Sequence, residues 1–268
     1  MSNNPMSDIN RTADQMQHPL FETAARAGHA VSGLLHLLIG YIAIRLALGK
    51  GGNADQSGAL SELASKPGGS VALWIAVVAF VALALWRVVE AIVGKRSESD
   101  SGGTFDKLKA AALAVVYFAF AWSAFSFARG AGKSSSEQNR GITAQLMGSG
   151  FGKVVLVVAG LVIVGVGGYH IYKGASKKFL DDLKPRSGKL AETLGFVGYI
   201  AKGAALAGVG VLVIVAVFTA DPNKAAGLDA ATKTLGQQAY GTILLIVAGL
   251  GIAIYGLYAF VMARYARM

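Results

Sequence analysis

The feature that most constrains this chain is a set of six apolar stretches, each long enough to cross a lipid bilayer. A membrane-spanning helix takes about 20 apolar residues, because each residue advances the helix by about 1.5 Å. Strands are disfavoured, since an open sheet leaves its edges unsatisfied in lipid and the stretches lack the alternating pattern of a membrane barrel. The sequence therefore predicts an all-α integral membrane protein with six transmembrane helices, placed at 27–48, 71–93, 108–129, 153–174, 195–219 and 241–263.

Composition agrees with this class and excludes several functions. Only 15% of the 268 residues are charged and 54% are hydrophobic, whereas soluble domains carry about 25% charged residues. The chain has no cysteine, which excludes disulfides, cysteine-based zinc sites, iron–sulfur clusters and thiol catalysis. The net charge of +10 comes from loops between apolar segments, so we expect no nucleic-acid partner and interpret it through the positive-inside rule.

The distribution of cations predicts the orientation. Lysine and arginine are more numerous in the N-terminal segment, the second and fourth loops and the C-terminus than in the other loops, and are densest at 173–189. We therefore expect both termini in the cytosol. Residues 1–19 are polar, contain no signal peptide and are expected to form a disordered cytosolic tail.

An internal repeat divides the chain into three units, at 20–96, 97–178 and 179–268. The first helix of repeat 1 matches the first helix of repeat 3 at one constant offset, and the second helices of all three repeats also align. The matched positions in the first pair are Leu20, Glu22, Thr23, Gly28, Gly33 and Gly40 with Leu190, Glu192, Thr193, Gly198, Gly203 and Gly210. Those in the second helices are Leu63, Gly69, Leu73, Ala76 and Trp86, with Leu146, Gly152, Leu156, Ala159 and Tyr169, and with Leu235, Gly241, Leu245, Ala248 and Tyr258.

Three expectations about architecture follow from the repeat. Each unit starts and ends on the same side, so the repeats are parallel and a pseudo-threefold arrangement about the membrane normal is predicted. The repeated glycines Gly28, Gly33, Gly40, Gly198, Gly203 and Gly210 are expected to mark close helix contacts. Each outer loop should hold a short interfacial helix, at 59–64, 142–147 and 228–235, and loop 175–193 is expected to rest Phe179, Leu180 and Leu183 on anionic headgroups.

These features resemble a bacterial membrane protein family known as domain of unknown function 1206. The resemblance covers about residues 20–268 and rests on the glycine-rich first helices, the short outer helices, the glycine before each second helix and the aromatic residue near its end. It implies three tandem repeats in a bacterial plasma (inner) membrane, and it carries no activity or catalytic residue. The chain departs from an even repeat at Phe105, Ala110 and Tyr117, where the other two first helices have glycine.

Ionisable residues within the spans are the candidate functional sites, since burying them in a membrane is costly. His29 and His36 lie on one face of the first helix, about 10.5 Å apart along its axis, too far apart to ligate one metal or haem iron. They are expected to form hydrogen bonds between packed helices, to line a proton or solute pathway, or to ligate a metal or haem with a residue of another helix. Arg87 and Glu90 are spaced to form an ion pair near a helix end, which is expected either to snorkel to the surface or to form a gate or binding site between repeats. In the repeat alignment His170 falls at the position of Arg87, and the two are predicted to face each other.

Two further sets of residues have ordinary explanations in a membrane. Lys109 and Lys202 occupy equivalent positions and are expected to extend to the cytosolic surface. An interfacial aromatic belt is predicted from Trp74, Trp86, Trp122, Tyr169, Tyr199, Tyr240 and Tyr258.

The sequence leaves three functions open. The first is a non-enzymatic scaffold or accessory subunit that binds the bilayer together with other membrane proteins or anionic lipid. The second is a channel or transporter with a pathway between the three hairpins. The third is a membrane enzyme or haem protein, although the chain carries no nucleophile motif, phosphate loop or metal-ligand spacing. We expect no enzymatic activity and no cofactor.

Overall fold

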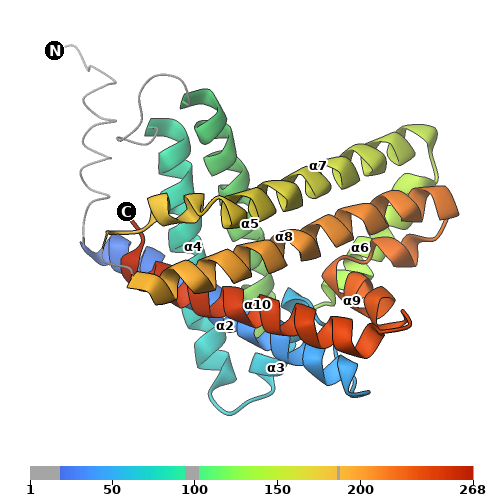
Figure 1. The fold of residues 1–268 in the computed structure, drawn as a ribbon, viewed down its shortest axis with the longest axis horizontal. Helices are drawn as coiled ribbons and strands as arrows, with labels where there is room; N and C mark the ends of the chain where they lie inside the picture. Colours follow the sequence, from blue (N-terminus) through green and yellow to red (C-terminus); the bar gives the residue numbers. More distant parts are fainter. Residues whose placement is uncertain (1–18, 94–102, 186–187, 268) are drawn as a thin grey trace.

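The computed structural model describes residues 19–93, 103–185 and 188–267 (Figure 1). Six long helices cross the molecule and confirm the predicted spans. They are α2 (Pro19–Ala47), α4 (Gly69–Val93), α5 (Gly103–Ala128), α7 (Gly150–Ala175), α8 (Gly188–Thr219) and α10 (Gly241–Tyr265). The predicted tail, apart from Pro19, lies outside the described residues, as do the side chains of Leu20, Glu22 and Phe105.

The ends of α2 and α5 are set by glycine. Gly49 and Gly130 follow these helices with φ of 73° and 72°, a left-handed conformation that glycine adopts without the penalty of a side chain. The α8 helix begins seven residues before its predicted start, directly at Gly188, whose φ is 75°.

One short helix lies between the two long helices of each repeat. These helices are α3 (Gln56–Ala64), α6 (Ser135–Met147) and α9 (Leu228–Gly236), which confirms the three predicted segments as helical. Two 3-10 turns complete the described secondary structure, η1 (Lys178–Asp182) and η2 (Pro222–Ala225). We call the end of the molecule that carries the short helices the short-helix end, and the opposite end, where α2 begins and α10 finishes, the terminal end.

A glycine in the first turn of each second helix has the same structural reason in all three repeats. A Cβ atom added to Gly69, Gly152 or Gly241 would lie 2.0 Å from a carbonyl oxygen of the preceding short helix. Real Cβ atoms do not approach oxygen so closely, so any side chain here would force the short helix away from the long one. All three repeats therefore have the same tight turn between the short helix and the second long helix.

The three closest pairs of long helices each join two different repeats. The α4 helix packs on α5, α7 on α8, and α10 returns to α2. Each repeat thus pairs its second helix with the first helix of the next repeat, and the last repeat closes on the first. This cyclic pairing is the arrangement expected of three parallel repeats around a common axis.

Glycines at seven-residue spacing hold two of these pairs together. A Cβ atom on Gly33 would lie 2.8 Å from the carbonyl oxygen of Gly256, and one on Gly203 would lie 2.6 Å from that of Gly167. The backbones are therefore in direct contact, as the sequence predicted. The remaining predicted glycines also lie at close contacts: Gly40 against Gly249, Gly210 against Gly160, Gly28 against Leu83 and Ala79, and Gly198 against Tyr255.

The α4–α5 pair is built differently. Ala84 and Ala110 are buried at the positions that correspond to Gly167 and Gly203. Tyr117 replaces the next glycine, and its ring lies 6.3 Å from that of Phe80. Rings in place of bare backbone hold this pair of helices together.

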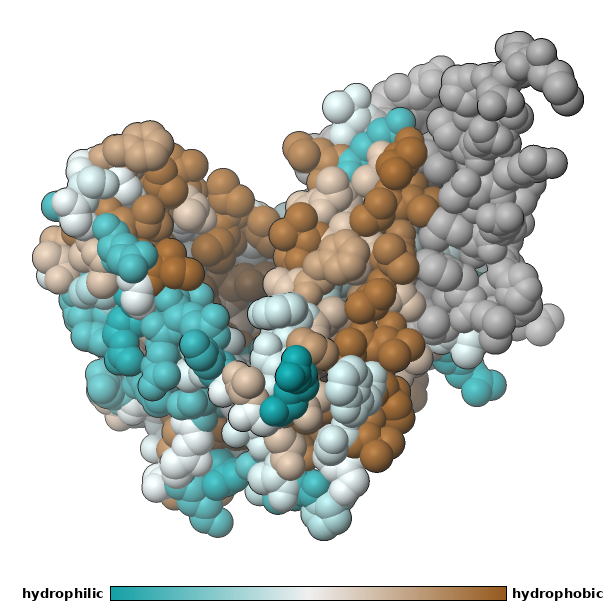
Figure 2. All heavy atoms as spheres, turned by 180° about the vertical axis from the view of Figure 1, so that it is seen from behind, coloured by the Kyte–Doolittle hydropathy of each residue, from teal (hydrophilic) through white to brown (hydrophobic). Residues whose placement is uncertain are grey.

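The two helices of repeat 2 also separate from each other. The other two repeats keep α2 close to α4 and α8 close to α10, whereas α5 and α7 make little contact along their length. Figure 2 shows the resulting hollow between the α4–α5 pair and the outer part of the α7–α8 pair, with apolar residues on both flanks. We call this hollow the α5–α7 groove.

Candidate functional site

Three of the long helices meet at a half-buried lysine. Lys202 of α8 donates a hydrogen bond to the Tyr255 hydroxyl of α10 at 2.9 Å, and its ammonium group lies 4.1 Å from the centre of that ring. His36 of α2 places its ring 4.8 Å from the same tyrosine. Gly198 allows this approach, since a Cβ there would lie 2.7 Å from the Tyr255 Cα.

Lys202 therefore bonds to the neighbouring helix α10, a contact that the expected extension to the surface did not include. The phenol beneath it supplies both a hydrogen-bond acceptor and the negative face of an aromatic ring, which together favour an ammonium group held inside the protein. Its repeat equivalent, Lys109, lies over the ring of Tyr169 at 5.4 Å. We call the group formed by His36, Lys202 and Tyr255 the lysine site.

A second charged group lies on α4. Arg87 and Glu90 form the ion pair predicted from their spacing, and their side chains are only 22% and 13% exposed. The Nε atom of Arg87 is buried without a hydrogen-bond partner. His29, buried on α2, lies within electrostatic range of both Arg87 and Lys202. His36 forms its hydrogen bond within α2, where its Nδ1 atom lies 2.7 Å from the Ser32 carbonyl oxygen.

His170 of α7 lies at the edge of the region around Lys202, within electrostatic range of that lysine. Its ring stacks on Tyr199 at 5.7 Å, and its Nδ1 atom lies 2.8 Å from the Val166 carbonyl oxygen, within hydrogen-bonding distance. Among the described residues it makes no hydrogen bond or ion pair with Arg87, and the facing of the two side chains stays a prediction. Within the same residues no three histidine, aspartate or glutamate side chains gather as a metal site.

Buried aromatic residues near the terminal end were missed by the sequence reasoning. Phe179 and Tyr258 are fully buried and Tyr199 is 6% exposed. The Tyr199 ring lies 5.5 Å from that of Phe179 and 5.4 Å from that of Tyr258. Gly195 leaves the space for this cluster, because a Cβ there would lie 2.2 Å from the Phe179 ring.

This cluster corrects two expectations. Tyr199 and Tyr258 are not part of an interfacial belt, whereas Trp74, Trp122, Tyr169 and Tyr240 are exposed as predicted. Phe179 and Leu183 do not rest on headgroups, because both are buried within the protein. Their segment turns inward as η1, and the Tyr258 hydroxyl contacts the Phe179 carbonyl oxygen at 3.4 Å, which satisfies a polar group that burial would otherwise leave unpaired.

Backbone bonds fasten the η1 segment to the end of α10. The Lys184 amide donates to the Tyr265 carbonyl at 2.7 Å, and the Arg267 amide donates to that of Asp182 at 3.0 Å. Arg26 of α2 adds bonds to the carbonyls of Ala263 and Arg264 at 2.9 and 2.8 Å. These contacts, which we call the η1 clasp, join the first and third repeats at the terminal end.

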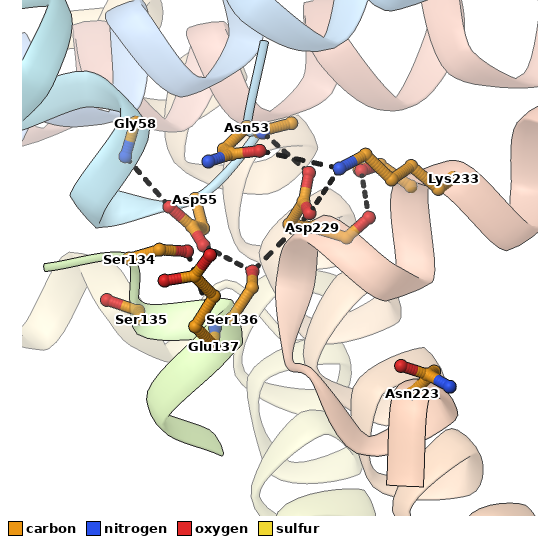
Figure 3. A network of polar contacts seen from close by, with 12 residues as sticks. Asn53, Asp55, Gly58, Ser134, Ser135, Ser136, Glu137, Asn223, Asp229 and Lys233 are labelled. Carbon is orange, nitrogen blue, oxygen red and sulfur yellow. Dashed lines mark hydrogen bonds and ion pairs between the residues drawn. The ribbon is translucent and has the colours of Figure 1, made fainter. Parts of the chain in front are cut away.

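A polar network joins the three repeats at the short-helix end (Figure 3). Its centre is Ser136 of α6, whose hydroxyl lies 2.9 Å from Asp55 of the first outer loop and 3.4 Å from Asp229 of α9. Both carboxylates are buried. Asp55 also accepts bonds from the Ser57 hydroxyl at 2.6 Å and the Gly58 amide at 2.9 Å.

Asp229 completes this network, which we call the loop network. It accepts a bond from the Ala54 amide at 3.2 Å and pairs with Lys233 at 2.7 Å. Buried carboxylates require such partners, since an unpaired charge in the interior is strongly destabilising. One signal in the sequence pointed to part of it: Asp55 stands directly before a short helical segment, the usual place of an N-cap.

Two pockets lie at the ends of the molecule. One of about 460 Å³ opens beside the loop network and includes Arg45 and Glu62 in its lining. Lys66 and Arg45 lower the pKa of the Glu62 carboxyl, chiefly through the hydrogen bond from Lys66. The other, of about 580 Å³, is lined by Lys184, Pro185, Arg264 and Tyr265. Neither pocket is lined by a residue of the lysine site.

Comparison with known proteins agrees with the observed repeats. Residues 27–94, 108–177 and 197–266 each match the family described as Domain of Unknown Function (DUF1206). An uncharacterized protein of Bacillus subtilis, YxxB, is 27% identical over 262 residues, which cover 95% of this chain and 94% of the relative. No solved structure matches. Since the three matched segments are the three pairs of membrane helices, the chain belongs to the DUF1206 family.

Proposed function

We propose that this protein is a non-enzymatic scaffold or accessory subunit of the bacterial plasma membrane that binds other membrane proteins or lipids. The observation that carries the proposal is the packing of its interior polar groups. Lys202 and His36 both contact Tyr255, and Arg87 is paired with Glu90. The η1 clasp and the loop network join the repeats at both ends. A rigid body of this kind suits a protein that offers binding surfaces to membrane proteins or lipids.

The terminal end faces the cytosol in this proposal. Its described residues include many cations, as the positive-inside rule requires. They are Arg26, Lys173, Lys177, Lys178, Lys184, Lys189, Arg264 and Arg267. A relative in Bacillus subtilis supports a bacterial plasma membrane as the location.

Single cysteines test the proposal, because the natural chain has none. His36→Cys, Arg87→Cys and Leu206→Cys would be treated with small membrane-impermeant thiol reagents from each side of the membrane. We expect no labelling at these sites in the folded protein, whereas Arg140→Cys in α6 and Lys189→Cys at the terminal end should label from opposite sides. Leu206→Cys removes no charge, so it still reports if the other two variants fail to fold.

A transport pathway is the second candidate, and the half-buried charges within the spans favour it. Lys202 has no carboxylate partner among the described residues, and the Nε atom of Arg87 is unpaired. Charged groups within spans often mark routes for ions or protons. Rapid labelling of His36→Cys or Leu206→Cys from either side would overturn the closed scaffold and make transport the leading function.

A further inference from the structure

The α5–α7 groove has a narrow end and an open end. Each of its two helices, α5 and α7, buries only one narrow stripe of residues. The buried residues of α5 are Ala110, Ala114, Ala121 and Ala124. Those of α7 are mostly Leu156 and glycines. Near the terminal end the helices approach, since the Lys109 ammonium group of α5 lies 5.4 Å from the centre of the Tyr169 ring of α7. Toward the short-helix end they diverge (Figures 1 and 2).

Two lysines and two tyrosines gather at the narrow end. Besides the contact between Lys109 and Tyr169, the Lys178 ammonium group of η1 lies 5.1 Å from the centre of the Tyr172 ring. Tyr169 and Tyr172 are 43% and 52% exposed, so the rings are accessible from outside the protein. We call Lys109, Tyr169, Tyr172 and Lys178 the lysine–tyrosine patch.

The cations of this patch are not neutralised by ion pairs. Neither Lys109 nor Lys178 forms a salt bridge among the described residues, whereas nearby Lys173 pairs with Asp182 and Lys177 pairs with Glu192. The hydrogen bond with Tyr172 raises the pKa of the Lys178 ammonium group, so this lysine stays charged at neutral pH. Asp181 lies within electrostatic range of Lys178 and leaves the patch with a positive balance.

We infer that the lysine–tyrosine patch binds the anionic headgroup of a phospholipid whose acyl chains lie along the α5–α7 groove. The two positively charged lysines complement the negative phosphate. Tyrosine rings at the end of a membrane span are commonly found at the depth of the headgroups. The exposed side chains of both helices are apolar and suit acyl chains. They include Val115, Phe118 and Trp122 on α5 and Val158, Leu161 and Val162 on α7. The inference rests on the proposed function and names the class of lipid that the scaffold holds.

Thermal unfolding of the full-length protein in nanodiscs tests the inference. Discs of phosphatidylcholine would be compared with discs that also contain phosphatidylglycerol, and the affinity would be measured by titrating the anionic lipid. We expect the anionic lipid to raise the unfolding temperature. Replacing both lysines in Lys109→Gln/Lys178→Gln should weaken its binding about thirtyfold, or about fivefold for each lysine.

The control variant is Lys153→Gln/Lys189→Gln, which removes the same charge from exposed positions of α7 and α8 away from the patch. It should keep the preference for the anionic lipid. An equal loss in both double variants, or no preference for the anionic lipid in the natural protein, would overturn the inference. Equal stabilisation by soluble inorganic phosphate would also overturn it, because the groove would then have no part in binding. Cysteine labelling at the lysine site reports on the scaffold independently of these results.

Discussion

The α7–α8 pair and the α4–α5 pair occupy equivalent places in the cycle but use opposite means of contact. In α7–α8, Gly167 and Gly203 bring the two backbones together. In α4–α5, alanine and the ring of Tyr117 hold the helices, with Phe80 and Phe120 packed beside the ring. The difference shows that the three repeats can keep one pattern of helix pairing although one pair is held by packed side chains in place of backbone contact. The two pairs should therefore respond to mutation in opposite ways.

Gly203→Leu should have the largest effect on stability. The new side chain would meet the Gly167 carbonyl and the Ile171 amide, and backbone atoms cannot move aside as a flexible side chain would. We expect a loss of about 3 kcal/mol or more, the upper end of overpacking costs, which lowers the unfolding temperature by about 10 °C. Unfolding in detergent followed by circular dichroism measures this.

Gly208→Leu is the matched control on the same helix. An added Cβ at Gly208 meets no atom within 4 Å, so the control should unfold within a few degrees of the natural protein. Equal losses at the two positions would show that helix propensity, and not contact between α7 and α8, explains the effect.

Tyr117→Ala should have an intermediate effect, confined to the α4–α5 pair. Removing a fully buried ring costs about 3–5 kcal/mol, and we expect about 2 kcal/mol here because Tyr117 is half-buried. Tyr117→Phe keeps the ring and should retain most of the stability. If the alanine variant were as stable as the natural protein, the ring would not be what holds this pair.

Ala110→Gly should have the smallest effect, and its sign is informative. The change restores the glycine found in the other first helices, yet Tyr117 still prevents the backbones from meeting. We therefore expect a loss of about 0.5–1 kcal/mol from the added backbone freedom, measured by chemical denaturation. A gain in stability would mean that α4 and α5 can close like α7 and α8, which would contradict the comparison.

Much of the fold was accessible from the sequence, because bilayer thickness and backbone hydrogen bonding leave few choices for long apolar segments. The tight glycines were also predictable, since Gly33 and Gly203 recur at one offset. Their partners were not: nothing in the order of the chain shows that α2 packs on α10 and not on its own neighbour. That pairing depends on the shape of all six helices together.

The candidate site was predicted only in part. His36 and Lys202 were recognised because charge within a span is costly, but Tyr255 has no such signal and was missed. Tyr199 and Tyr258 were assigned to the interface because tyrosine near the end of a span is usually found there. Their burial depends on Phe179, which comes from a loop, and on the space left by Gly195.

The cyclic pairing also bears on how the protein is made. Because α2 is synthesised before its principal partner α10, the glycine face of α2 remains unpaired until α10 has been inserted. The pairs α4–α5 and α7–α8 can form as the chain emerges, so closure of the ring is the final step of assembly. A chain truncated before α10 would contain the pairs α4–α5 and α7–α8 and an unpaired α2. Quality-control proteases of the membrane could recognise this state.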